Sequence, residues 1–112
     1  MWYTLGMRPK PKLKKKLLSL GQTIKIVTKI IHKKLPKVKV FLFGSRARGL
    51  PRPYSDIDIG LLGKEKINYK YILELEEEID GLATFLEIQL VDLGCASEKF
   101  RDGVLEYAKR LI

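Results

Sequence analysis

Two short polar motifs interrupt the apolar middle of this chain and limit the folds that it can adopt. The hexapeptide Gly-Ser-Arg-Ala-Arg-Gly at residues 44–49 directly follows an apolar stretch, and Asp56-Ile57-Asp58 opens a second one that runs to Leu62. Alternating side chains in both stretches predict β-strands, over residues 37–44 and 55–62. The chain is therefore predicted to contain a strand–turn–strand unit with polar groups gathered at one end.

The rest of the chain alternates between helix and strand signals. Leucine and isoleucine recur every three or four residues from Leu13 to Leu35 and again from Ile72 to Leu82, which predicts amphipathic helices ending at Pro36 and near Gly81. Residues 84–93 predict a third strand, and Ser97 is placed to cap a last helix that buries residues such as Phe100 and Tyr107. The predicted order is α-β-turn-β-α-β-α.

Size and charge set further bounds. The 112 residues suit one domain, 1–112, with residues 1–10 as a poorly ordered lead-in. Residues 1–52 hold 15 Lys or Arg and no Asp or Glu, whereas residues 53–112 hold 7 basic and 13 acidic side chains. A basic end of this kind can attract polyanions or can simply be solvated, and both interpretations stay open. We expect no membrane-spanning helix. We also expect a cytoplasmic location, because the single cysteine, Cys95, suits a reducing compartment. Cys95 itself is expected to be a small buried residue.

The turn at residues 44–49 has the features of a phosphate-binding loop. A strand that ends in Gly-Ser and continues into a helix start would expose backbone N–H groups toward an anion. Gly44 allows close approach of the backbone, Ser45 adds a hydroxyl donor, and Arg46 and Arg48 can neutralise charge. These four residues are our candidate nucleotide-binding residues.

The two aspartates sharpen this interpretation. Asp56 and Asp58 are two residues apart on a predicted strand, so both side chains emerge on one face, roughly 6.5–7 Å apart at the backbone. Like charges so placed are unfavourable unless a cation or a basic group lies between them. Mg²⁺ binds carboxylates while keeping positions for water and phosphate oxygens. The alternative is that Asp58 merely pairs with an arginine of the neighbouring turn.

Together, the segments 44–49 and 55–60 resemble the signature of the DNA polymerase β-like nucleotidyltransferase superfamily, and the short chain resembles its minimal nucleotidyltransferases. The resemblance implies an α/β (α+β) nucleotidyltransferase fold with a small mixed sheet of three to four strands, flanked by about three to four helices. It implies that Gly44 and Ser45 hold the triphosphate of ATP and that Asp56 and Asp58 bind magnesium, as two ions. Members of this group often act as antitoxins beside a HEPN-type ribonuclease toxin, and some transfer AMP to a tyrosine of that toxin.

The third strand departs from the family pattern. Aligning Asp92-Leu93 with the family places Gln89 where a third carboxylate is usual. Glu87 lies on the same predicted strand face one pleat earlier, so either Glu87 serves as the third catalytic and metal-binding acid or the site lacks this acid. Asp92 has the opposite parity and is expected to point away.

The resemblance thus implies a magnesium-dependent nucleotidyltransferase that moves AMP from ATP to a hydroxyl of a partner protein and acts as the antitoxin of a HEPN/MNT pair. Two alternatives stay open: a binding module that neutralises a toxin by complex formation, and a nucleic-acid-directed nucleotidyltransferase that uses the basic N-terminal half. Homo- or hetero-oligomers are compatible with the exposed helices. Tyr54, beside the motif loop, is a further candidate for contact with a nucleotide.

Overall fold

The computed structural model describes residues 17–49 and 56–112. Along the chain they form α1 (Leu20–Lys34), β1 (Lys39–Phe43), β2 (Ile57–Leu62), α2 (Tyr69–Asp80), β3 (Ile88–Asp92), α3 (Glu98–Tyr107) and β4 (Lys109–Arg110). This confirms the predicted element order and adds one short strand at the end. The N-terminal lead-in, the lysines at positions 10–16 and Tyr54 lie outside the described residues.

The four strands form one mixed sheet in the order β3-β2-β1-β4. β1 pairs antiparallel with β2 and with β4, and β2 pairs parallel with β3. β1 and β2 are therefore the two inner strands, which explains why both are almost continuously apolar.

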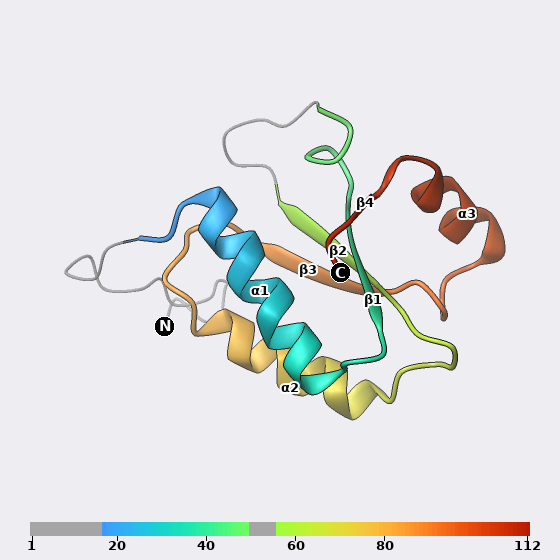
Figure 1. Ribbon diagram of the computed structural model, residues 1–112, viewed down its shortest axis with the longest axis horizontal. Coiled ribbons are helices and arrows are strands. Elements are labelled where there is room, and N and C mark those ends of the chain that lie inside the picture. The colour runs from blue at the N-terminus through green and yellow to red at the C-terminus, as the bar shows by residue number, and fades with distance from the viewer. Residues whose placement is uncertain (1–16, 50–55) are drawn as a thin grey trace, which may run out of the picture.

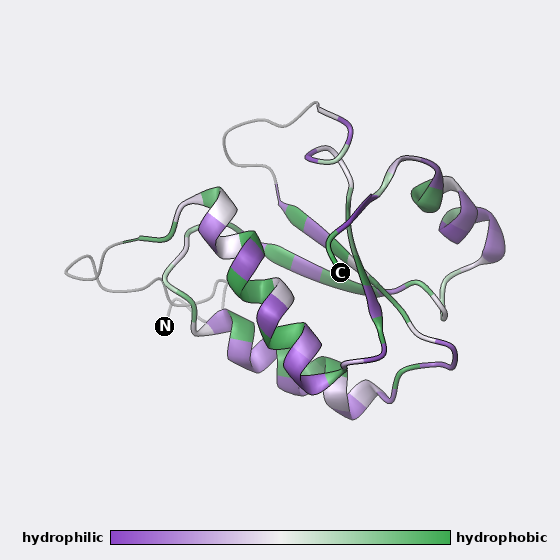
Figure 2. Cartoon of the chain, in the orientation of Figure 1, coloured by the Kyte–Doolittle hydropathy of each residue, from purple (hydrophilic) through white to green (hydrophobic). Residues whose placement is uncertain are grey.

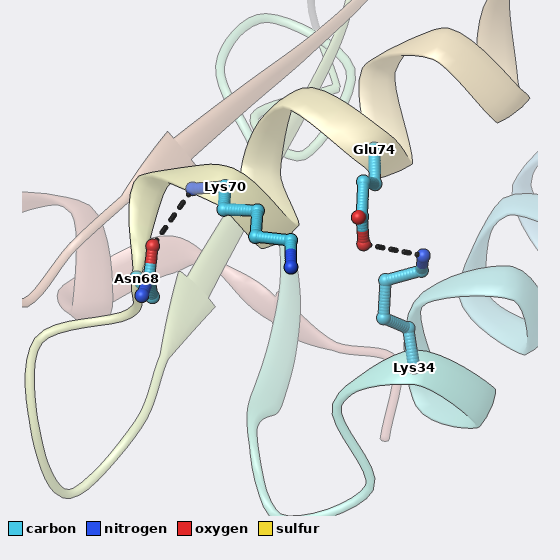
Figure 3. Close-up of polar contacts among 4 residues, drawn as sticks. All are labelled: Lys34, Asn68, Lys70 and Glu74. Atoms are coloured by element: carbon cyan, nitrogen blue, oxygen red, sulfur yellow. Dashed lines mark hydrogen bonds and ion pairs between the residues drawn. The ribbon is translucent and has the colours of Figure 1, made fainter.

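Helices α1 and α2 cover one face of the sheet (Figure 1), and their apolar stripes build the main core. Hydrophobic and hydrophilic residues alternate along both helices, as Figure 2 shows. Lys34 of α1 forms an ion pair of 3.0 Å with Glu74 of α2, and Asn68 caps α2 by accepting from the N–H of Lys70 (Figure 3). The main core consists of Val27, Ile31, Val40, Leu42, Ala47, Ile57, Ile59, Leu61, Ile67, Ile72, Leu75 and Ile79.

Helix α3 lies apart from the other two helices (Figure 1) and packs on the opposite face of the sheet. A small buried cluster of Phe43, Leu93 and Val104 joins it to the strands. We call this group the α3 cluster. It leaves the end of β2 that carries Asp58 only partly covered.

Several local predictions are wrong in detail. Residues 17–19 precede α1 rather than lying within it, because Ser19 caps the helix in a reciprocal pair of hydrogen bonds with Gln22, of 3.1 and 2.9 Å. Residues 84–87 are not part of β3, since the Thr84 hydroxyl accepts from the N–H of Leu86 and so forms a local turn. The helix predicted from Ile72 to Leu82 is confirmed as α2, and Ser97 is confirmed as the cap of α3.

Two side chains expected inside are exposed. Phe100 keeps 47% of its surface accessible and touches Phe43 only edge-on, with ring centroids 6.3 Å apart. Cys95 is exposed as well, and its thiol donates to Asp92 at 3.2 Å. That hydrogen bond, with a smaller effect of burial, raises the pKa of the Cys95 thiol, which makes it a poor nucleophile.

Candidate active site

The register of the sheet brings the glycine of the first motif against an aspartate of the second. Phe43, the last residue of β1, pairs with Asp58 of β2, so Gly44 follows directly beside the Asp58 side chain. Gly44 has a φ of +74°, a left-handed conformation that favours glycine. A Cβ atom at this position would overlap Asp58 Oδ2 and lie 3.0 Å from Asp58 Cγ. The backbone angle therefore favours glycine here, and a larger residue would displace the Asp58 carboxylate.

Residues 45–49 form a single turn rather than the expected start of a helix. The N–H groups of Ala47 and Arg48 both donate to the Gly44 carbonyl at 3.2 Å. Ala47 is buried in the main core and fixes the turn against the sheet. A helix dipole consequently plays no part over these residues, and any anion binding depends on the turn and its side chains.

Asp58 is half-buried and Asp56 is exposed, and they stand on either side of the fully buried Ile57. Ile57 and Ile59 face the main core, so Asp58 projects from the opposite face of β2. Burial raises the pKa of Asp58, and the negative charge of Asp56 raises it further. The two carboxylates are thus close enough to repel each other across a partly desolvated surface.

The residue beside Asp58 on the neighbouring strand β3 is a glutamine, whose side chain is a neutral amide. Gln89 is the register partner of Asp58 across the parallel β2–β3 pair. Glu87 lies just ahead of β3, and its carbonyl accepts from the N–H of Ile57 at 2.8 Å. Within residues 17–49 and 56–112, no three His, Cys, Asp or Glu side chains gather in a group that could hold a metal ion. Glu87 is therefore not assembled with Asp56 and Asp58 into a three-carboxylate site.

Asp92 has a local structural role, as its parity suggests. Its Oδ2 accepts from the Ile67 N–H at 3.2 Å and its Oδ1 from the Gly94 N–H at 2.9 Å. These bonds tie the end of β3 to the segment that leads into α2. Asp92 is thus used in connecting elements rather than in the site around Asp58.

A residue that the sequence analysis assigned only to the core also reaches the turn. The Tyr107 hydroxyl, at the end of α3, accepts from the Gly44 N–H at 3.4 Å. The guanidinium carbon of Arg48 lies 4.3 Å from the centroid of the Tyr107 ring. Arg48 and Tyr107 also line a cavity of about 770 Å³, together with Lys99 and Phe100. Nothing in the sequence around Tyr107 indicates this contact, which depends on how α3 packs.

The residues around Gly44 fit a magnesium–nucleotide complex in two respects. Gly44, which has no side chain, lets the backbone of the turn approach the Asp58 carboxylate closely. The donors there are carboxylate oxygens, which Mg²⁺ prefers, and two carboxylates suffice when phosphate oxygens supply the remaining ligands. The assignment of Asp56, Asp58 and Glu87 to metal binding stays a prediction.

A four-stranded mixed sheet with helices placed in this way is the fold of a nucleotidyltransferase. One solved neighbour is a toxin–antitoxin crystal structure with AMP-PNP, which superposes with a TM-score of 0.66 at 30% sequence identity, over 80% of this chain and 72% of that one. Another is a tri-AMPylated HEPN toxin from Shewanella oneidensis in complex with its MNT antitoxin, with a TM-score of 0.61 at 25% identity, over 80% of this chain and 69% of that one.

The sequence comparisons agree with the structural ones. The chain is 28% identical over 82 residues to a protein named "Probable protein adenylyltransferase MntA" from Haemophilus influenzae, covering 73% of this chain and 72% of that protein. Residues 13–112 match the family described as "Polymerase beta, Nucleotidyltransferase". The chain belongs to this nucleotidyltransferase family, and the fold and the family that the sequence indicated are confirmed. No helix in the described part of the chain is long and apolar enough to cross a membrane.

Proposed function

We propose that this chain transfers AMP from ATP to a hydroxyl group of a HEPN-type partner protein, in a magnesium-dependent reaction, and that it acts as the antitoxin of that partner. Three similarities support the proposal: the adenylyltransferase name of the curated relative, the AMP-PNP in one structural neighbour and the AMPylated HEPN toxin in another. The observation in this chain that carries the proposal is the close approach of Gly44 to Asp58.

The chemistry is an in-line displacement at the α-phosphorus of ATP. The acceptor hydroxyl oxygen forms a bond to that phosphorus, the bond to the β-phosphate oxygen breaks, and pyrophosphate leaves while the hydroxyl proton passes to a base. Bound Mg²⁺ would neutralise phosphate oxygens on both sides of the displacement. The chain itself must hold the triphosphate still and accept or relay the proton.

The side chains divide these tasks by position. Ser45 holds the phosphates at the turn, where Gly44 allows the backbone to approach closely, and Arg46 and Arg48 offset their negative charge. Because the Gly44, Ala47 and Arg48 N–H groups donate within the protein, we assign direct phosphate contact chiefly to the Ser45 hydroxyl and the arginine side chains. Asp56 and Asp58 would hold the metal ion.

Glu87 is our candidate for the third acid, which would accept the proton of the acceptor hydroxyl. It precedes the strand that pairs with β2, one residue ahead of the register pair Ile57 and Ile88. Glu87 could therefore reach the acceptor hydroxyl only because the side chain of glutamate is longer than that of aspartate. Removing a positioned base typically slows such a step by ~10²–10⁴-fold.

The test uses ATP labelled in its α-phosphate, Mg²⁺ and, as the partner, the purified protein encoded by the gene adjacent to that of this chain. We expect label on that partner with the wild-type chain and none with Asp58→Asn. Asp102→Asn serves as the matched control, since Asp102 is an exposed aspartate on α3 away from β2, and it should transfer label normally. Equal labelling by all three proteins would contradict the proposal.

One observation favours a second candidate, a binding module that neutralises its partner without chemistry. Gln89, which cannot act as a base, is the register partner of Asp58. In that case the partner would co-purify with the chain and lose its ribonuclease activity, yet it would carry no label after incubation with ATP and Mg²⁺. Asp58→Asn would then leave neutralisation intact.

A further inference from the structure

We infer that Tyr107 is a positioning residue for the phosphate-binding turn, which it holds at both ends through two different groups. Its hydroxyl accepts from the Gly44 N–H at the beginning of the turn, at 3.4 Å, and its ring lies under Arg48 at the other end, at 4.3 Å. The inference rests on the proposed function in one respect: the turn is taken to bind the phosphates of ATP.

Tyr107 is well suited to hold another segment because it is itself held from several sides. It ends α3, and the next residue, Ala108, donates its N–H to the Val104 carbonyl at 2.9 Å. Its side chain packs against both the main core and the α3 cluster. Few alternative positions are therefore open to the ring.

Strand β4 strengthens this connection. It begins two residues after Tyr107 and pairs with β1, Lys109 opposite Leu42 and Arg110 opposite Phe41. β1 is also the strand that ends at Gly44. Tyr107 and the turn are thus attached to the same strand, one through β4 and the other through the chain itself, so their relative position is fixed by the sheet.

The contact has a chemical consequence for Arg48. An exposed arginine samples many side-chain conformations, and a cation–π contact favours the one that lies over the ring. In that conformation Arg48 lines the cavity of about 770 Å³ that it shares with Lys99. The lining of that cavity also includes the Glu106 carboxylate but not Ser45 or Asp58. We therefore assign only Arg48, as part of the turn, to the β- and γ-phosphates of ATP, the part that leaves as pyrophosphate.

Two substitutions separate the groups of Tyr107. Tyr107→Phe keeps the ring and removes the hydroxyl, so the Gly44 amide should exchange its hydrogen faster while ATP affinity stays near wild type. Tyr107→Leu removes both, and ATP affinity should fall about two- to fivefold, which is the range expected for an exposed cation–π contact. AMP affinity should change little in either variant, because AMP lacks the β- and γ-phosphates.

A double-mutant cycle with Arg48→Met tests whether the two residues act together. Tyr107→Leu should cost no further ATP affinity once Arg48 has been replaced. Fully additive losses, equal losses for ATP and AMP, or unchanged ATP affinity in a Tyr107→Leu variant with a wild-type melting temperature would each overturn the inference. Purely structural damage would lower AMP and ATP binding alike.

The outcomes also distinguish this inference from the proposed function. A wild-type chain that binds ATP but labels no partner refutes the proposed transfer and leaves the affinity comparison intact. If label transfer persists but the substitutions of Tyr107 leave ATP affinity unchanged, only the inference about Tyr107 is refuted. The exchange measurement at Gly44 requires no ligand, and an unchanged rate in Tyr107→Phe would contradict the hydroxyl contact directly.

Discussion

Replacing Gly44 by alanine should damage the site far more than the same replacement at Gly49. The two glycines have nearly the same backbone angle, with φ of +74° and +75°. They differ in their surroundings: a Cβ on Gly44 would overlap Asp58 Oδ2 and lie 3.0 and 3.2 Å from Asp58 Cγ and Cβ, whereas a Cβ on Gly49 would have nothing within 4 Å. Gly49→Ala therefore reports the backbone cost alone.

The expected magnitudes follow from these two terms. A left-handed alanine costs about 1–2 kcal/mol in either position. At Gly44 the Asp58 side chain must also leave its present conformation, which adds about 0.5–1.5 kcal/mol. Gly44→Ala should thus lower the free energy of unfolding by about 1.5–3.5 kcal/mol. The loss of unfolding free energy beyond that of Gly49→Ala is small, but all of it comes from displacing the Asp58 side chain.

Binding of the magnesium complex of ATP should separate the variants more clearly than stability does. Displacing a group that orients a metal ligand typically reduces metal affinity about 10–100-fold. Isothermal titration of each variant with ATP and Mg²⁺, beside thermal melts without ligand, gives both quantities. The reasoning is refuted if both variants lose the same affinity, or if Gly44→Ala binds like wild type while its fold is intact.

Three further substitutions test other parts of the structure. Asp58→Asn should abolish label transfer yet raise the melting temperature without ligand at neutral pH. The raised pKa of Asp58 means that the folded state binds the proton more tightly than the unfolded state does, so the stability of the wild-type chain falls as the pH rises through that pKa. The higher melting temperature of Asp58→Asn should therefore disappear when both proteins are measured in acid, where Asp58 is protonated. Gln89→Glu places a carboxylate beside Asp58; because Glu87 is our candidate base, label transfer should stay close to wild type, and an increase of ~10²–10⁴-fold would contradict that assignment. Gly103→Ala, with open space around its Cβ in α3, should add about 0.5–1 kcal/mol of stability, and a lower melting temperature would contradict this.

The sequence predicted the parts of the fold that depend on local pattern. The alternation in residues 37–44 and 55–62 identified the two inner strands, and helical periodicity identified all three described helices. The start of α1 was missed although the signal Ser19-x-x-Gln22 is present, because the apolar stripe continues ahead of the cap. The two residues of β4 give no strand signal of their own, and they pair only because β1 offers an open edge.

In the candidate site, too, local sequence pattern predicted some features, whereas others depend on tertiary packing. Gly44, Asp56 and Asp58 could be selected from residue type and spacing, since a strand places alternate side chains on one face. Alignment with the family pattern placed Gln89 at the position of the third carboxylate, and the structure shows that Gln89 is the register partner of Asp58. Tyr107 could not be found in this way, because it is 63 residues from Gly44 and meets the turn only through the packing of α3. Contacts made by tertiary packing leave no periodic pattern in the sequence.

The two faces of the sheet therefore have different consequences for mutation. On the face covered by α1 and α2, the side chains of Ile57, Ile59 and Leu61 are completely buried, and shortening any of them to alanine should cost about 2–5 kcal/mol. On the other face, Asp58 carries a charge that burial and Asp56 both disfavour, so the folded chain retains it at a cost. A carboxylate kept in such surroundings, in close contact with the backbone of Gly44, is most simply explained by a ligand that binds there. Substitution of Asp58 should thus impair the reaction while sparing the fold, and shortening Ile57, Ile59 or Leu61 should do the reverse.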